Sequence, residues 1–218
     1  MSLKHSFYRH GRRHIEIHIY IDKENMDTKE LNALKDRAYK TAIAHGFHEE
    51  ERPDAFWLGL VMSEMGEAIN ADRIGRHAVT QVFDEDLVNM PFTDCFEVYI
   101  KNSVEDEIAD IVIRLLDFAG VKGYELYVER DNFPDFHDAL RTFKESGQPG
   151  LFFVLMDSLS DAFDFDWEEL RTRICDIIYI FWDYFGKMTG SDKGLWYFVE
   201  QKMKYNELRP NSKGEKKY

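Results

Sequence analysis

The sequence has few of the features that stabilise small secreted proteins or anchor membrane proteins. It contains two cysteines, Cys95 and Cys175, and no CxxC pair. Two isolated cysteines indicate neither a disulfide framework nor a thiolate zinc site. The chain also lacks a run of about 18 apolar residues, and its first residues lack the apolar core of a signal peptide. We therefore expect a soluble, cytoplasmic protein that does not enter a membrane.

Positive charge is scarce as well. Lysine and arginine number 28 against 41 aspartates and glutamates, which gives a formal net charge of −13 at pH 7. This balance disfavours binding to nucleic acids or anionic membranes, because both attract basic surfaces. A polyanionic substrate would need a metal ion or a local basic segment. Apolar residues still make up 44% of the 218 residues, enough for a buried core.

Residues 1–26 form a basic N-terminal appendage in which one strand is expected. Residues 15–22 alternate isoleucines with polar side chains, which is the pattern of a half-buried strand. Segments 96–101 and 124–129 are candidate partner strands, although 96–101 could equally be helical. The β structure is thus expected to be a small addition to a helical protein.

The remainder of the chain predicts helices. Thr28 is a candidate N-cap for the first, which Gly46 would end. Further helices are expected over 54–78, from Asn102 or Ser103 to Gly120, and over 150–163, 167–187 and 193–207. We expect one all-α domain over 27–218. Its parts are an acid-bearing half (27–120), a connector (121–149), a second half with the C-terminal helix (150–207) and a basic tail (208–218).

The two halves resemble each other. Segment 57–72 aligns with 151–166, and 108–120 aligns with 174–186, with similar apolar stripes. This predicts an internally duplicated helical hairpin arranged about a pseudo-twofold axis, with the acid pairs described below lost from the second copy. The alternative is that any two amphipathic hairpins look somewhat alike.

Two acid pairs are the most informative feature of the chain. Glu64 and Glu67 are spaced i, i+3 in one expected helix, and Glu107 and Asp110 have the same spacing in another. If these helices pack side by side, four carboxylates converge and repel one another unless a hard cation such as Mg²⁺ lies among them. The simpler account of one pair alone is a solvated face, with Asp110 paired to Arg114 four residues later.

The sequences SEMGEA and EDEIAD around these acids resemble the ExxE and ExxD signature of the MazG-like all-α NTP pyrophosphatase superfamily, which includes dimeric dUTPases and dCTP pyrophosphatases. The C-terminal sequence KMKYNELRP is also similar to members of this family. The resemblance covers roughly residues 30–120 and 196–218. It departs at Ser63, where many members carry another glutamate, and in the long gap 68–106, which suggests an insertion over the substrate.

The resemblance implies Mg²⁺-dependent hydrolysis of a nucleoside triphosphate between the α and β phosphates, with Mn²⁺ as an alternative ion. One carboxylate must accept the proton of the attacking water, and we expect this to be Glu64. We expect three groups of site residues: metal ligands Glu64, Glu67, Glu107 and Asp110; phosphate-binding Lys202, Asn206, Arg209, Lys216 and Lys217; and nucleobase-binding Phe47, His48 and Trp57. A core position is the competing interpretation for Trp57.

Other functions stay open from the sequence. A non-catalytic MazG-like scaffold, or a regulatory nucleotide-binding protein, would carry the same residues. A di-metal oxidase bundle is excluded, because it needs an ExxH pair and no acid in this chain has a histidine three residues later. Neither the base nor the sugar of the nucleotide can be assigned, and both a homodimer and a single-chain pseudo-dimer are compatible with the pattern.

Overall fold

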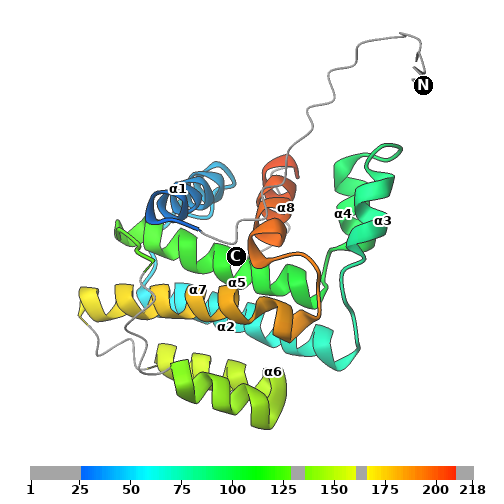
Figure 1. Ribbon diagram of the computed structural model, residues 1–218. Coiled ribbons are helices and arrows are strands. Elements are labelled where there is room, and N and C mark those ends of the chain that lie inside the picture. The colour runs from blue at the N-terminus through cyan, green and yellow to red at the C-terminus, as the bar shows by residue number, and fades with distance from the viewer. Residues whose placement is uncertain (1–25, 129–135, 161–165, 210–218) are drawn as a thin grey trace, which may run out of the picture.

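The computed structural model describes residues 26–128, 136–160 and 166–209, and in these ranges the chain is all-α with no strand (Figure 1). This confirms the expected fold class. The predicted strand at 15–22 lies outside the described residues. None of the helices in these ranges is long and apolar enough to cross a membrane. The helices are α1 Thr28–Ala44, α2 Asp54–Arg73, α3 Thr80–Asp86, α4 Phe92–Tyr99, α5 Val104–Lys122, α6 Phe136–Ser160, α7 Trp167–Thr189 and α8 Leu195–Leu208.

Helix α5 is the centre of the molecule. It contacts α1, α2, α7 and α8, and Figure 1 shows α1 and α8 on one side of it with α2 and α7 on the other. Its apolar residues cover most of its circumference, and Ile108, Val112, Leu115 and Phe118 have no exposed surface. A helix that is apolar on nearly all sides needs neighbours on all sides. The polar residues that α5 does carry are therefore placed among other helices.

Helices α2, α5, α7 and α6 contact one another in a ring, because α2 touches α5 and α6 while α7 touches the same two helices. In the alignment of the two halves, α6 corresponds to α2 and α7 corresponds to α5. Two similar hairpins packed about a twofold axis would make such a ring. The ring is compatible with internal duplication, and the duplication itself stays a prediction.

Local sequence signals account for several helix ends, most clearly those of α1, α5 and α7. Asp27 caps α1 in a capping box with Glu30, one residue before the expected Thr28. The Ser103 side chain accepts a hydrogen bond from the Asp106 amide at 3.2 Å and caps α5. Helix α5 ends at Lys122, followed by the C-cap Gly123 with a left-handed φ of 67°, rather than at Gly120. Helix α5 therefore begins and ends close to the predicted positions, whereas α2 begins at the predicted Asp54 but ends at Arg73 rather than at residue 78.

Three segments differ from the sequence-based expectation. Residues 96–99 belong to helix α4 rather than to a strand, and residues 124–128 have no regular structure. Helix α6 begins at Phe136, inside the segment 121–149 expected to be a connector. It consists of two helical stretches separated at Gly147, which has φ 64° and ψ −160°. Gly147 and the nearby Pro149 do interrupt the helix, but the chain is helical on both sides of them.

Helices α3 and α4 come between α2 and α5 along the chain, and in space they lie to one side of the molecule, where α4 contacts α8 (Figure 1). The ring of Phe96 stacks on that of Tyr205, with 4.4 Å between centroids. The Tyr205 hydroxyl donates a hydrogen bond of 2.7 Å to Glu97. The two short helices are thus attached to α8, and the chain leaving α4 passes close to the start of α5.

Candidate metal centre

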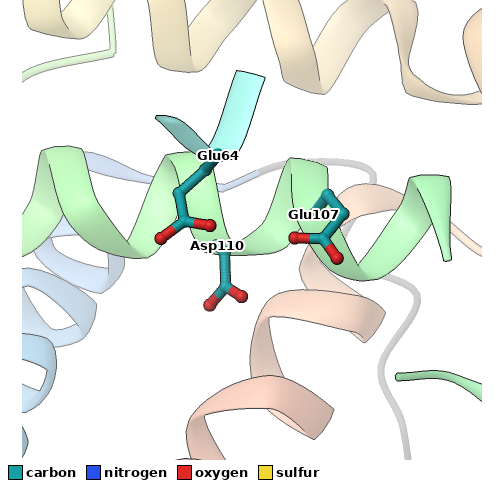
Figure 2. A group of neighbouring side chains, drawn as sticks. All are labelled: Glu64, Glu107 and Asp110. Atoms are coloured by element: carbon teal, nitrogen blue, oxygen red, sulfur yellow. The ribbon is translucent and has the colours of Figure 1, made fainter. Parts of the chain in front are cut away.

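Three of the four predicted metal ligands gather in one place. Glu64, Glu107 and Asp110 each present a carboxylate oxygen such that all three oxygens lie within 4.8 Å of one another. Figure 2 shows Glu64 coming from α2, and Glu107 and Asp110 from consecutive turns of α5. The i, i+3 spacing on α5 and the packing of α2 against α5 together produce the cluster.

Packing of α2 places Glu64 at the cluster. Its neighbours Val61, Met65 and Ala68 have no exposed surface because they face the core. Glu64 lies at the edge of this apolar stripe and is only 9% exposed. A carboxylate so placed needs a partner, because burying an unpaired charge is costly.

Glu67 is exposed and is not among the three acids whose oxygens converge. It lines the same cavity as the other three acids. The structure therefore brings together three of the four predicted ligands and places the fourth nearby. Ligation by Glu67 stays a prediction.

The acids open onto a cavity of about 260 Å³. Its walls come from α1, α2, α5 and α8 and from the turns after α1 and before α5. The lining residues are Ala38, Thr41, Ala42, His45, Phe47, Glu64, Glu67, Lys101, Asn102, Glu107, Asp110, Ile113, Arg114, Asp117, Lys202, Met203, Tyr205, Asn206 and Arg209. Predicted metal ligands and predicted phosphate-binding residues therefore share one cavity, although the sequence separates them widely.

Two cations contact the acid cluster. Lys202 Nζ lies 2.6 Å from Asp110 Oδ2 and 2.9 Å from Asp106 Oδ1. Arg114 Nε donates a hydrogen bond of 3.1 Å to Glu64 Oε1. Burial lowers the pKa of Lys202, but attraction from Asp106 and Asp110 outweighs burial, so the pKa is raised and the side chain stays charged. Lys202, predicted to bind phosphate, is thus engaged by two carboxylates.

Burial and repulsion disfavour ionisation of the acids. Burial, with repulsion from Asp106 and Asp110, raises the pKa of Glu107 to about 8. Burial and repulsion from Asp110 also raise the pKa of Glu64, against the attraction of Arg114. Glu107 therefore holds a proton at neutral pH when no metal is bound. A divalent cation would have to displace that proton.

The cluster suits a hard divalent cation. Carboxylate oxygens are the ligands that Mg²⁺ and Mn²⁺ prefer, and burial together with repulsion between the acids raises the pKa values of Glu64 and Glu107, so that a bound cation would relieve this repulsion. Glu64, Glu107 and Asp110 are the residues that would hold such an ion. The donor set does not discriminate between Mg²⁺ and Mn²⁺.

The three aromatic or imidazole residues predicted to contact the base do not all line the cavity. Phe47 lines the cavity. His48 lies between Tyr39 and Trp57, with centroid distances of 5.1 and 4.8 Å, and its Nε2 is 2.8 Å from Asp117. Trp57 is buried and belongs to the hydrophobic core. His48 and Trp57 are not among the cavity-lining residues, so only Phe47 is placed to contact a ligand there directly.

The C-terminal residues predicted to bind phosphate are described as far as Arg209. Asn206 and Arg209 line the cavity, and the buried Nε of Arg209 has no hydrogen-bond partner within the described part of the chain. An unpaired guanidinium donor is suited to a phosphate oxygen. Lys216 and Lys217 lie outside the described residues, and their role stays a prediction.

Several site residues were not singled out from the sequence. Asp106 is fully buried and paired with Lys202, and the Asn102 amide donates a hydrogen bond of 2.8 Å to its side chain. Asn102 has a positive φ of 59°, which fixes the turn into α5. Lys101 precedes it and also lines the cavity. The only sequence signal for these residues was the capping spacing of Ser103 and Asp106.

A scan against protein-family models found no match to this chain, and neither did searches of curated proteins and of solved structures.

Proposed function

We propose that this protein is a divalent-metal-dependent nucleoside triphosphate pyrophosphohydrolase. The observation that carries the proposal is the convergence of Glu64, Glu107 and Asp110 in a cavity that also contains Asn206 and Arg209. Clustered carboxylates and phosphate-binding donors in one cavity suit a metal-bound polyphosphate. The resemblance of both acid motifs to the MazG-like superfamily supports the same reaction.

In the proposed reaction, a water oxygen attacks the α-phosphorus and the bond to the bridging α–β oxygen breaks, leaving a nucleoside monophosphate and pyrophosphate. Bound Mg²⁺ would neutralise phosphate charge and lower the pKa of the water. Glu64, buried where α2 packs against α5, accepts the proton released by the water. Arg209 binds a phosphate oxygen through its guanidinium group, and Phe47 provides an apolar face for the base.

A second function is supported by one observation. Arg114 and Lys202 already contact Glu64 and Asp110, so two of the acids have cationic partners without any metal. A regulatory protein that binds a nucleotide without hydrolysing it, or a non-catalytic scaffold, would be stable in this form. Hydrolysis distinguishes the enzyme from both.

The test is pyrophosphate release from a panel of ribo- and deoxyribonucleoside triphosphates with Mg²⁺. We expect Glu64→Gln and Glu107→Gln to lower kcat/KM at least about 100-fold, because both remove charge from the metal ligands. Glu145→Gln, a substitution at an exposed position of α6, should leave activity unchanged. Circular dichroism should show equal helicity in all variants.

Binding of a triphosphate without pyrophosphate release would favour a regulatory nucleotide-binding protein over an enzyme. Full activity of Glu64→Gln would contradict the proposed site.

A further inference from the structure

Arg114 makes an unexpected contact. It lies four residues after Asp110 on α5, the spacing at which a helix surface pair would form. Its Nε instead donates to Glu64 on α2, and within the described residues it makes no other hydrogen bond. The guanidinium carbon lies 5.8 Å from the centroid of Phe47. Arg114 therefore joins the two acid helices at the cavity wall.

This contact uses a carboxylate that also belongs to the acid cluster. Glu64 has an oxygen within 4.8 Å of oxygens of Glu107 and Asp110, the arrangement that suits a divalent cation. A guanidinium hydrogen-bonded to Glu64 and a divalent cation ligated by Glu64 draw on the same negative charge. The guanidinium and the divalent cation would also repel each other, because both would contact the same carboxylate. Binding of one therefore opposes binding of the other.

Arg114 is held less firmly by its acid partner than Lys202 is by its two partners. Lys202 is held between two acids, Asp106 and Asp110, and only 10% of its side chain is exposed. Arg114 has one acid partner, and 27% of its side chain is exposed. The Lys202 contact is built into the helix packing, whereas the Arg114 contact can be broken at lower cost.

A second acid is close to Arg114. Burial raises the pKa of Asp117, and attraction from His48 and Arg114 opposes that rise. Asp117 accepts a hydrogen bond from His48 and lines the same cavity as Arg114. An Arg114 side chain released from Glu64 would keep a negative neighbour and the ring of Phe47 while still facing the cavity.

We propose that Arg114 is a displaceable counterion of the metal centre. It neutralises Glu64 while no metal is bound, gives up Glu64 when a divalent cation binds, and then pairs with a phosphate group of the nucleotide in the same cavity. A guanidinium presents a planar set of donors that matches phosphate oxygens. The proposal rests on the proposed function for the identity of the nucleotide but not for the competition with metal.

The first experiment measures Mn²⁺ binding by electron paramagnetic resonance in the full chain without nucleotide, at pH 8.5 so that competition from protons is small. Arg114→Met should bind Mn²⁺ at least about tenfold more tightly, because a positive charge beside the ion is removed. Arg73→Met is the matched control: it removes one charge from α2, nine residues after Glu64. It should change the affinity less than about twofold, because that charge is distant and screened.

The second experiment measures binding of a non-hydrolysable nucleoside triphosphate at saturating Mn²⁺. Arg114→Met should weaken it at least about tenfold, because a charge-assisted contact to phosphate is lost. Should Arg114→Met fail to fold, Arg114→Gln carries the same tests, since glutamine retains a polar contact to Glu64 without the charge.

Unchanged or weaker Mn²⁺ affinity in both variants would overturn the counterion role. Unchanged nucleotide affinity would overturn the phosphate contact. Absence of pyrophosphate release by the wild-type protein would count against the proposed function alone, because the Mn²⁺ measurement needs neither nucleotide nor turnover.

Discussion

Glu107 shows how strongly the surroundings of one side chain can shift its pKa in this protein. Its pKa of about 8 in the folded state exceeds the ordinary value of 4.5, first because of burial and then because of Asp106 and Asp110. At a pH between these two values, the Glu107 carboxyl of the metal-free folded protein retains a proton that it has released in the unfolded chain. The contribution of Glu107 to stability is therefore full below about pH 4.5 and is lost as the pH rises through about 8.

The corresponding prediction concerns the stability of the protein with all metal chelated. The free energy of unfolding should fall between pH 5 and pH 8, and Glu107→Gln should reduce this fall because glutamine does not titrate. Urea unfolding across this range measures the effect. Glu145→Gln is the control, because Glu145 is exposed. Equal pH slopes in the wild-type protein and Glu107→Gln would show that Glu107 ionises normally.

Lys202 gives a second prediction about a single buried side chain. Lys202→Met leaves Asp106 and Asp110 without their shared cation inside the protein. Breaking a buried ion pair from one side costs about 3 kcal/mol or more, because the remaining charge is unpaired. Urea unfolding should show this loss, whereas Lys144→Met at an exposed position of α6 should change stability by less than about 0.5 kcal/mol. A loss no greater than that of the control would mean that solvent stabilises both acids.

The sequence predicted which acids matter but not what neutralises them. Spacing alone placed Glu107 and Asp110 on consecutive turns, and the margin of an apolar stripe placed Glu64. The partners depend on how helices pack: Arg114 reaches across to α2 rather than along α5, and Lys202 arrives from α8. No local pattern determines which of several carboxylates a long cationic side chain selects.

At the scale of elements, the approach of α1 to α5 depends on one position. A Cβ added to Gly120 would lie 2.6 Å from Cβ of Tyr39, so the two helices contact each other where α5 has no side chain. Gly120→Ala should therefore destabilise the protein by about 2 kcal/mol, since the helices must separate to relieve the overlap. Thermal or urea unfolding measures this change.

Gly59 is the control for Gly120. It lies inside α2, and an added Cβ there would meet no atom within 4 Å. Gly59→Ala should stabilise the protein by up to about 1 kcal/mol, because alanine favours a helix more than glycine does. Equal effects of the two substitutions would show that α1 and α5 can adjust without cost.

Helix positions were predicted well where periodicity and caps agree, as for α5 and α7, whereas α2, which has no side-chain cap, ends before the predicted residue 78. The helical structure of the insertion was left open by the sequence: segment 96–101 could be a strand or a helix, and its residues 96–99 enter α4, where Phe96 packs on Tyr205. Tertiary packing outweighed local preference there. The start of α6 was missed because Gly147 and Pro149 signal a break, which the structure contains within the helix rather than before it.

At the scale of the whole molecule, the acid cluster links α2 to α5, and Lys202 links α5 to α8. An ion bound by Glu64, Glu107 and Asp110 would hold together helices distant in sequence and would bind only the folded chain. Mg²⁺ should therefore raise the unfolding free energy, by about 2.7 kcal/mol at 100 times its dissociation constant.

Thermal unfolding with and without MgCl₂, at constant ionic strength, measures this stabilisation. Glu64→Gln should lose most of it, whereas Glu145→Gln should retain it. An equal shift in both variants would indicate that Mg²⁺ binds elsewhere on this acidic protein.

Helix α5 carries two of the clustered acids and also contacts four other helices. Amide hydrogens at its centre should exchange with solvent deuterium only when the entire domain opens, because no smaller opening exposes a helix covered on so many sides. Chemistry in most proteins is borne by loops that fluctuate independently of their scaffold. In this protein, the backbone that carries Glu107 and Asp110 should therefore keep its position for as long as the domain stays folded.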